Sequence, residues 1–294
     1  MKLVARAPGK VNLSLFLGPV RSDGRHELVT LFESVSLADS IELTGAPADA
    51  DEVVCPGVPG PNIVGRALVG LREGGWGAPP VRIAIRKRIP VAGGMGGGSA
   101  DAAAVLRMAP ALGPVSEAVV GAIATSLGAD VPSQLAPGVS IGTGAGEVVS
   151  PVDPLGPHAF VIVPQAFGLS TADVFREADR LGLPRGTDEL TGRLRELRAA
   201  LGSGAPLPPE LLVNDLEPGA ISLRPEIGRA LDAVRELSAA CAVVSGSGPT
   251  VFGLFHGPDA PARAETAARY LLDRYPEATS AAPVSEEFGA PRGS

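Results

Sequence analysis

The alternation of hydrophobic and polar residues along the chain predicts a mixed fold of strands and helices. In the first third, period-two patterns typical of half-buried strands cover residues 2–7, 11–17, 28–37 and 41–43. Turn residues at 22–24 and 38–40 separate these strands. Residues 45–61 hold many Pro, Gly and Asp residues, so we expect a loop there.

Helical and strand patterns then follow one another as far as residue 150. Asn62 is a good N-cap for a helix that runs to about Glu73, and residues 81–86 alternate like a strand. The other elements expected in this part are helices near 99–110 and 115–126, a turn over 128–132 that can open a short helix, and a hairpin over 138–150.

A cluster of Pro, Gly and Asp at residues 151–157 marks the best domain boundary. Because 294 residues are many for one core, we expect two domains, residues 1–152 and 153–294. The second domain is expected to hold strands at 159–163, 241–245 and 250–255, and helices near 171–181, 187–201, 223–237 and 260–273. The tail from about Ala281 is small, polar and proline-containing, and we expect it to be mobile.

Composition and charge narrow the class of function. The net charge of −7 and the pI of about 5.1 argue against a general nucleic-acid or anionic-membrane surface. The basic run at 86–88 is too short to change this and is expected to be a solvated strand end. Cys55 and Cys241 have no metal-ligand companions, so free thiols in a reducing compartment are expected. With no signal-peptide core and no bilayer-spanning run, we expect a cytoplasmic protein.

The most informative segment runs from Pro90 to Asp101, where five glycines occupy the six positions 93–98 and an alanine-rich helix follows. Glycine permits positive φ and close approach of a ligand, and a helix start presents unpaired N–H groups and positive dipole charge. Ser99 is a good N-cap, and Asp101 falls in the first turn of the expected helix. Strand, glycine loop and helix start together predict a phosphate site rather than a flexible linker.

Two better-known phosphate loops are excluded by inspection. The Walker A motif needs Lys and then Ser or Thr after its last glycine, whereas Ser99 and Ala100 follow Gly98. No frame of residues 93–101 matches the pattern Gly-x-Gly-x-x-Gly. A second glycine-rich turn, residues 245–250, is either an ordinary hairpin turn or a loop that closes over the phosphates from the second domain.

Three segments, taken in order, resemble the signature motifs of the GHMP kinases, the small-molecule kinases that include galactokinase, homoserine kinase and mevalonate kinase. These segments are Pro8 to Leu13, Pro90 to Asp101 and Ser245 to Thr250. The resemblance covers nearly the whole chain. It implies an α+β fold of two domains, each a layered α/β sandwich, with the active site in the cleft between them.

Further segments resemble the GHMP kinases that act in non-mevalonate isoprenoid biosynthesis. They are residues 23–28, 128–132, 144–147 and 214–218. This resemblance implies ATP-dependent phosphorylation of the 2-hydroxyl of a cytidine-diphospho-methylerythritol substrate. A different alcohol acceptor, or a non-catalytic nucleotide-binding homologue, stays open as an alternative.

The resemblance also implies roles for individual residues. Lys10 and Asp130 match the family's catalytic pair. Asp130 would accept the proton of the substrate hydroxyl, and Lys10 would keep Asp130 ionised and add positive charge near the transferring group. Without the resemblance, Asp130 would be explained as a helix cap and Lys10 as an exposed strand lysine.

The cofactors implied are ATP and Mg²⁺. Backbone N–H groups of residues 93–98 would hold the β and γ phosphates, with the Ser99 hydroxyl near a phosphate or a Mg²⁺ ion. No carboxylate is assigned as a metal ligand. The nucleotide-binding residues implied are Pro90, Val91, Ala92, Gly93, Gly94, Met95, Gly96, Gly97, Gly98, Ser99 and Ala100.

For the second substrate, Asn12 and His26 match family positions that contact the cytidine-bearing ligand. Thr171 and Phe175 match further contacts, and Phe175 is placed to stack on cytosine. A turn histidine and a core phenylalanine are the plainer explanations. The chain departs from the family at Arg25, where a tyrosine usually packs on the pyrimidine; a guanidinium plane can also stack on a base.

Overall fold

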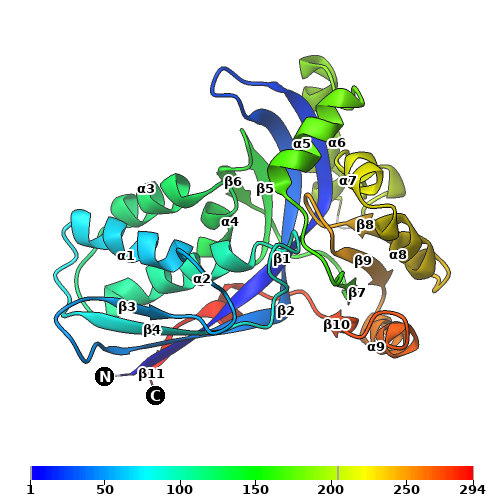
Figure 1. The fold of residues 1–294 in the computed structure, drawn as a ribbon. Coiled ribbons are helices and arrows are strands. Elements are labelled where there is room, and N and C mark those ends of the chain that lie inside the picture. The colour runs from blue at the N-terminus through cyan, green and yellow to red at the C-terminus, as the bar shows by residue number, and fades with distance from the viewer. Residues whose placement is uncertain (1, 204, 294) are drawn as a thin grey trace.

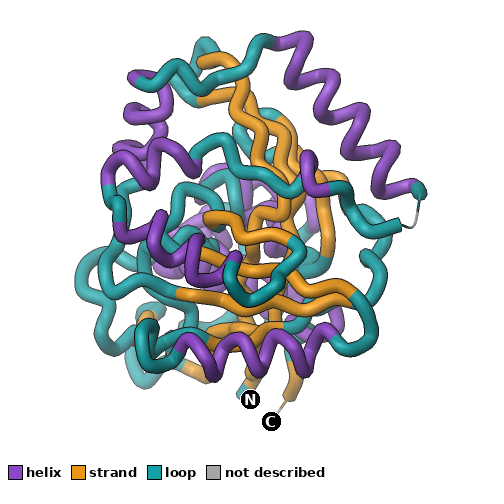
Figure 2. The backbone as a smooth tube through the Cα atoms, turned by 90° about the vertical axis from the view of Figure 1, so that its right-hand side faces the viewer, coloured by secondary structure: helices purple, strands orange, loops and turns teal. Residues whose placement is uncertain are grey.

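The structure, a computed structural model, describes residues 2–203 and 205–293. Two β-sheets carry the core of the molecule, and helices pack on one face of each (Figures 1 and 2). The strands are β1 (Leu3–Val20), β2 (His26–Gly45), β3 (Glu52–Val54), β4 (Val81–Arg86), β5 (Val139–Thr143), β6 (Val148–Pro151), β7 (His158–Val163), β8 (Cys241–Val244), β9 (Val251–His256), β10 (Thr279–Ala281) and β11 (Arg292–Gly293).

The α-helices are α1 (Ile63–Glu73), α2 (Gly97–Met108), α3 (Glu117–Leu127), α4 (Val131–Leu135), α5 (Thr171–Arg180), α6 (Thr187–Gly202), α7 (Glu217–Leu223), α8 (Glu226–Arg235) and α9 (Ala260–Leu271). Short 3₁₀ helices are η1 (Ala109–Ala111), η2 (Pro209–Leu211) and η3 (Glu286–Gly289). Side-chain caps explain several helix starts. Asn62 accepts from the amide of Val64 to begin α1, as the sequence predicts, and Ser170 accepts from the amide of Asp173 to begin α5.

The first sheet is built on the long antiparallel hairpin of β1 and β2. Its strand order is β11-β1-β2-β4-β3, and β5 joins β2 and pairs with β6. A register shift at Pro8 and Gly9 lets β1 continue past a proline that cannot donate a ladder hydrogen bond. For that reason residues 2–7 and 11–17 form one strand instead of two. The tip of the hairpin projects beside α5 (Figure 1).

The second sheet has the order β10-β7-β9-β8 and is antiparallel throughout. One face packs on α5, α7, α8 and α9. The other face packs on the first sheet, where Phe160 and Phe252 share a core with Val11 and Leu13. A third core lies between the first sheet and helices α1, α2 and α3.

Three segments differ from the sequence-based expectation. Residues 38–40, predicted as a turn, lie within β2, and the Asp39 carboxylate accepts from the amides of Arg88 and Ile89. The Asp39 carboxylate makes these long-range hydrogen bonds instead of the bond to a nearby backbone amide by which aspartate often forms a turn. The predicted loop 45–61 contains β3, and α7 lies in a stretch where no helix was expected. Both are too short to leave a periodic pattern.

The tail from Ala281, expected to be mobile, instead packs back onto the first sheet. The Val284 amide donates to the Ser34 carbonyl, the Arg6 guanidinium lies over the Phe288 ring, and β11 pairs with β1. The small residues of the tail permit this close packing, which their composition alone does not reveal. The division at residues 152 and 153 stays a prediction. None of the described helices has the length and apolar run needed to cross a membrane.

Candidate active site

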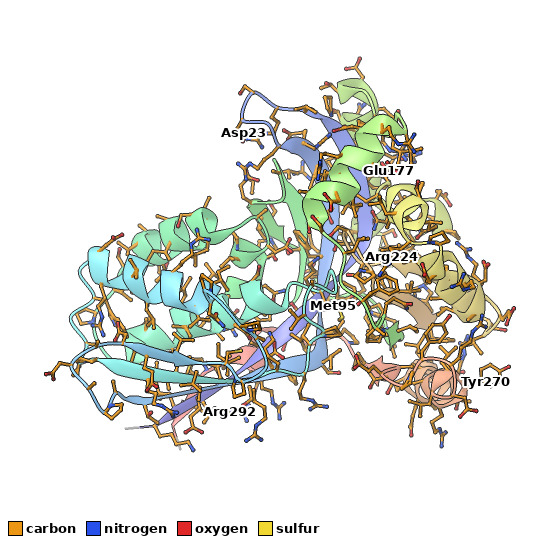
Figure 3. The ribbon with its side chains drawn as sticks, in the orientation of Figure 1. Asp23, Met95, Glu177, Arg224, Tyr270 and Arg292 are labelled. Carbon is orange, nitrogen blue, oxygen red and sulfur yellow. The ribbon has the colours of Figure 1, made fainter. Side chains whose placement is uncertain are left out.

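A cleft of about 570 Å³ opens between the glycine loop, the middle of β1 and β2, the start of α4, and α5. The predicted residues that line it are Lys10, Asn12, Pro90, Val91, Ala92, Gly93, Gly94, Gly96, Gly97, Gly98, Ser99, Asp130, Thr171 and Phe175. Met95 and Ala100 have side chains buried in the core; Figure 3 shows Met95 between the two halves of the molecule. Arg25 and His26 lie outside the lining.

The first residues of α2 present their amides to the cleft. Gly96, with φ of 65°, is the N-cap, and the first intrahelical bond runs from the Ala100 amide to the Gly96 carbonyl. Helix geometry therefore leaves the N–H groups of residues 97–99 without intrahelical partners. The prediction that Ser99 caps this helix is wrong. A left-handed glycine starts the helix earlier and makes Ser99 its third residue.

Two glycines of the loop are required by their surroundings. At Gly94, with φ of 76°, a Cβ would collide with the Ser245 carbonyl oxygen and lie 2.8 Å from the Gly248 carbonyl oxygen. At Gly96 a Cβ would lie 3.3 Å from the Lys10 side chain. The loop is thus pressed between β1 and the turn that joins β8 and β9.

Lys10 is buried and its ammonium group has three oxygen neighbours. It donates to the Asn12 amide oxygen at 2.7 Å and to the Gly94 carbonyl at 2.8 Å, and it lies 3.6 Å from an Asp130 carboxylate oxygen. The Asn12 side chain is itself held by Thr30 at 2.8 Å. The exposed-lysine explanation is therefore wrong for Lys10. The structure brings the predicted catalytic pair together beside the glycine loop.

Asp130 stands at the N-cap position of α4 but makes no side-chain capping bond. Its side chain is 35% exposed, lines the cleft and faces Lys10. The backbone of Asp130 is fixed instead, because its carbonyl accepts from the Ser133 hydroxyl at 2.9 Å. The carboxylate is therefore held at the cleft and left free to accept a proton from a bound group.

The second glycine turn, residues 245–250, contacts the first. The Ser245 hydroxyl donates to the Gly94 carbonyl at 3.1 Å, and the Thr250 amide donates to the Gly93 carbonyl at 3.3 Å. Asn214 holds the turn by donating to the Gly246 carbonyl at 2.6 Å. The turn thus packs on the glycine loop and supports it; whether it also closes over a phosphate stays a prediction.

A cluster of charged side chains beside Gly97 of the glycine loop was not predicted. The Lys87 ammonium lies 2.8 Å from Asp101 and also binds Asp39, so Lys87 is not the solvated strand end that we expected. A Cβ on Gly97 would lie 3.2 Å from this ammonium. Burial raises the pKa of Asp101 to about 7, while Lys87 opposes the shift. Asp101 is in the second turn of α2 rather than the first.

Helix α5 contributes Thr171 and Phe175 to the cleft lining. Phe175 contacts His26, with ring centroids 5.3 Å apart, and the Thr171 hydroxyl lies 2.9 Å from that of Ser247. The Nε2 atom of His26 lies 2.8 Å from an Asp179 carboxylate oxygen. Sequence inspection did not identify Asp179, because the contact joins residues 153 positions apart.

Arg25 lies in the turn between β1 and β2, outside the cleft lining. Its guanidinium binds Asp23 at 2.9 Å and Glu147 at 3.5 Å, and its side chain is 51% exposed. The Arg25 amide and guanidinium lower the pKa of the Asp23 carboxyl. Figure 3 shows Asp23 at the hairpin tip, beside the helix that carries Glu177. A stacking role for Arg25 stays a prediction.

Comparison with known proteins gives consistent similarities. Residues 62–138 match the family model "GHMP kinases N terminal domain" and residues 184–276 match "GHMP kinases C terminal". The chain is 41% identical over 272 residues to 4-diphosphocytidyl-2-C-methyl-D-erythritol kinase of Corynebacterium efficiens, covering 85% of this chain and 84% of that protein. It is 43% identical over 272 residues to the enzyme of that name from Rhodococcus jostii, covering 89% and 86%.

A solved structure is also similar. The crystal structure of a 4-(cytidine 5'-diphospho)-2C-methyl-D-erythritol kinase matches with a TM-score of 0.75 and 32% identity. The match covers 95% of this chain and 98% of that chain. Sequence and structure thus point to the same relatives over nearly their full length.

Proposed function

We propose, because this chain belongs to the GHMP kinases and among them to the 4-diphosphocytidyl-2-C-methyl-D-erythritol kinases, that it phosphorylates the 2-hydroxyl of 4-diphosphocytidyl-2-C-methyl-D-erythritol with ATP. This reaction is a step of non-mevalonate isoprenoid precursor biosynthesis. The observation that carries the proposal is that Lys10 and Asp130 meet in one cleft, beside the glycine loop and the amide-bearing start of α2.

Phosphoryl transfer requires a hydroxyl in line with the γ-phosphorus and positive charge around the phosphoryl oxygens. Asp130 accepts the hydroxyl proton as the new oxygen–phosphorus bond forms, and the bond between the β and γ phosphates breaks to release ADP. Lys10, held by Asn12 and the Gly94 carbonyl, fixes Asp130 and adds positive charge beside the transferring group.

The start of α2 binds the phosphate tail. Its unpaired amides at residues 97–99 and the positive helix end both favour an anion. Mg²⁺ belongs to this proposal because bound metal would neutralise phosphate charge during transfer. Among the described residues no three His, Cys, Asp or Glu side chains form a metal cluster. The Ser99 hydroxyl lines the cleft at the start of α2 and would lie near a phosphate or the ion, with phosphate oxygens and water as ligands of the metal.

The acceptor binds at the opposite end of the cleft. Thr171 and Phe175 would supply a hydroxyl and a ring face there, and Asn12 lines the same cleft. His26 is outside the lining and packs against Phe175, so it would support that ring. Arg25 is also outside the lining, in an ion pair with Asp23.

The proposal is tested with a coupled assay for ADP release. We expect turnover only when ATP, Mg²⁺ and the cytidine-diphospho acceptor are all present. Asp130→Asn should lower kcat by about 100- to 10,000-fold, because it removes the proton acceptor. Asp153→Asn changes an exposed carboxylate outside the cleft and should leave kcat unchanged.

Two outcomes would contradict the assignment. Full turnover by the Asp130→Asn variant would remove Asp130 from the mechanism. Strong activity with mevalonate or homoserine, and none with the cytidine compound, would replace the acceptor with another alcohol. The ion-paired Arg25, in place of the usual tyrosine, is the observation that makes this control necessary.

A further inference from the structure

Arg107 lies on α2 and binds three other segments of the chain through one guanidinium group. Its Nη2 atom donates to the Arg6 carbonyl at 2.9 Å, its Nε atom donates to the Gly289 carbonyl at 3.3 Å, and its Nη1 atom donates to the Gln134 carbonyl. All three acceptors are main-chain oxygens, and they belong to β1, to η3 and to α4. Burial lowers the pKa of the guanidinium to about 10, so the group stays charged at neutral pH.

The bond to the Gln134 carbonyl matters because α4 is short. In a helix of five residues most carbonyls lack an intrahelical donor, and Gln134 is the fourth of the five. Apolar contacts of Val131 and Leu135 hold α4 against the first core, but such contacts have no direction. Arg107 is the one described side chain outside residues 130–135 that hydrogen-bonds the main chain of α4. Its bond therefore fixes where α4 lies along that core.

The two segments joined to α2 in this way carry the proposed catalytic pair. Lys10 lies four residues beyond Arg6 on β1, and Asp130 lies four residues before Gln134 at the start of α4. The Asp130 carboxylate makes no capping bond, so its place follows the backbone of α4. Helix α2 itself begins at the glycine loop. One guanidinium thus ties together the strand of the lysine, the helix of the aspartate and the helix that presents amides to the cleft.

The C-terminal segment closes the remaining side of the guanidinium. A Cβ on Gly289 would lie 3.0 Å from the Nη2 atom of Arg107 and 3.2 Å from the Pro137 side chain, so glycine lets the main chain come close. The Arg6 guanidinium lies 4.5 Å from the centre of the Phe288 ring, and β11 pairs with β1. The segment therefore covers Arg107 and supplies an acceptor in place of water, which a buried donor requires.

We propose that Arg107 is a positioning residue for phosphoryl transfer: by binding β1, α4 and the C-terminal segment together, it holds the Asp130 carboxylate in its place beside Lys10. The inference rests on the proposed function for the role of Asp130. Arg107 is outside the cleft lining, so its loss should change the geometry of transfer and not the binding of either substrate. A displacement of about 1 Å caused by a distant substitution can lower a rate about 100-fold.

The first test compares Arg107→Met with Arg72→Met by steady-state kinetics. Arg107→Met should lower kcat about 10- to 100-fold and change the KM of ATP and of the acceptor less than about threefold. Arg72 is the matched control, because it is outside the lining and its guanidinium also donates to main-chain carbonyls, those of Trp76 and Pro79 at 3.1 Å, and binds Asp51. Thermal unfolding should show a loss of stability in both variants, and kcat should fall only in Arg107→Met.

A second test asks whether Arg107 acts through Asp130. In the Asp130→Asn background, Arg107→Met should lower the residual rate less than about twofold, because the group that Arg107 positions is already absent. In Arg107→Ala, guanidinium chloride at about 10 mM, far below denaturing concentrations, should raise kcat at least about threefold. Sodium chloride at the same concentration should not.

Arg107→Lys keeps the charge but cannot reach three carbonyls in a fixed fork, so its kcat should fall about three- to tenfold. This variant carries the same tests if the larger changes prevent folding.

A measurement without turnover separates the inference from the proposed function. Amide hydrogen exchange over residues 128–137 should be faster in Arg107→Met than in the wild type, and exchange over α5 should be unchanged. If the wild type fails to phosphorylate the cytidine acceptor, the proposed function is overturned, while exchange over residues 128–137 still judges the tie that Arg107 makes. Unchanged exchange there, a normal kcat in Arg107→Met, an equal kcat loss in Arg72→Met, or a full further loss in the double variant would overturn the inference.

Discussion

The two halves of the cleft are built in different ways. The nucleotide half is mostly main chain: consecutive residues of one loop provide amides at the start of α2, and the turn at 245–250 holds that loop by backbone and hydroxyl contacts. The proposed acceptor half is mostly side chain, with Thr171 and Phe175 of α5 in the lining and His26 of β2 packed against Phe175. Every nucleotide carries phosphate, which backbone amides in fixed positions can bind. Recognition of one particular base depends on side chains, whose identity can differ from one protein to another.

This contrast predicts how each half fails. Substitutions in the nucleotide half, or of Lys10 or Asp130 beside it, remove interactions made with the transferring group and should lower kcat. Damage to the acceptor half removes interactions made equally before and during transfer, so it should raise the KM of the acceptor.

The largest effect is expected for Lys10→Met, which should lower kcat about 1,000-fold. The variant removes the ammonium that joins Asn12, the Gly94 carbonyl and Asp130, and with it the charge beside the transferring group. Steady-state kinetics with ADP detection measures this. A normal kcat with a raised acceptor KM would contradict this, because it would show that Lys10 binds the acceptor and not the transferring group.

The next effect is expected for Gly94→Ala, with an activity loss of about 100-fold. A Cβ there collides with the Ser245 carbonyl oxygen, so the two glycine turns must separate. Gly57→Ala is the control for backbone strain, because Gly57 also has positive φ (81°) but its Cβ would meet nothing within 4 Å. It should cost about 1–2 kcal/mol of stability and no activity. Equal activity losses in both variants would show that strain, not the turn contact, is responsible.

A smaller change is expected for Phe175→Ala. The acceptor KM should rise about 10-fold or more, which is the usual contribution of an aromatic ring stacked on one base. The KM for ATP, measured in the same experiments, should stay within about twofold and is the internal control. A raised KM for ATP would mean that Phe175 belongs to the nucleotide half.

A buried contact between His158 of β7 and Glu33 of β2 joins the two sheets. Of the effects predicted here, its effect on stability should be the smallest. The His158 Nδ1 lies 2.7 Å from the Gly156 carbonyl, and its Nε2 lies 2.9 Å from Glu33. A carbonyl only accepts, so Nδ1 carries a proton, and Nε2 and Glu33 share a second one. Burial opposes charge on the ring, but the Glu33 contact outweighs it and raises the pKa of His158. Burial also raises the pKa of Glu33.

The sign of the pH effect follows from these directions. The folded pair holds a proton that the unfolded chain releases, so its contribution is complete below the unfolded pKa of His158, near 6.5, and is lost as pH rises through the higher folded value. The pKa of His256, beside His158, is lowered by burial, so its opposing effect lies below 6.5. Urea unfolding should show wild-type stability falling by about 1 kcal/mol above pH 6.5.

Glu33→Gln is the matched variant for this effect. A glutamine amide can donate to an unprotonated Nε2, so the contact no longer needs the shared proton. The decrease in stability above pH 6.5 should flatten in this variant. The same slope in both proteins would show that another group is responsible.

The sequence predicted the strand, the glycine loop and the helix of the proposed nucleotide half for a physical reason. These elements are contiguous in the chain, and glycine itself indicates the conformation that the loop must adopt. The prediction from the sequence was wrong at two positions: left-handed Gly96 starts α2 before Ser99 can cap it, and the Asp39 carboxylate accepts from the amides of Arg88 and Ile89 instead of making a turn. Local patterns do not show a long-range partner of the second kind.

The acceptor half was predictable only through the resemblance to known kinases. No spacing joins His26 to Asp179, and the bond between them exists because α5 packs beside the hairpin tip. Arg25, where the chain departs from the family's usual tyrosine, has contacts with Asp23 and with the distant Glu147. Long-range contacts of this kind depend on tertiary packing, which binary patterns do not specify.

The most direct test of the account is a crystal structure of the protein with a non-hydrolysable ATP analogue and the cytidine-diphospho acceptor. The account predicts the terminal phosphates within hydrogen-bond distance of the amides of residues 97–99, and the acceptor hydroxyl between the γ-phosphorus and the Asp130 carboxylate. A phosphate tail bound elsewhere, or an acceptor hydroxyl out of reach of Asp130, would contradict it.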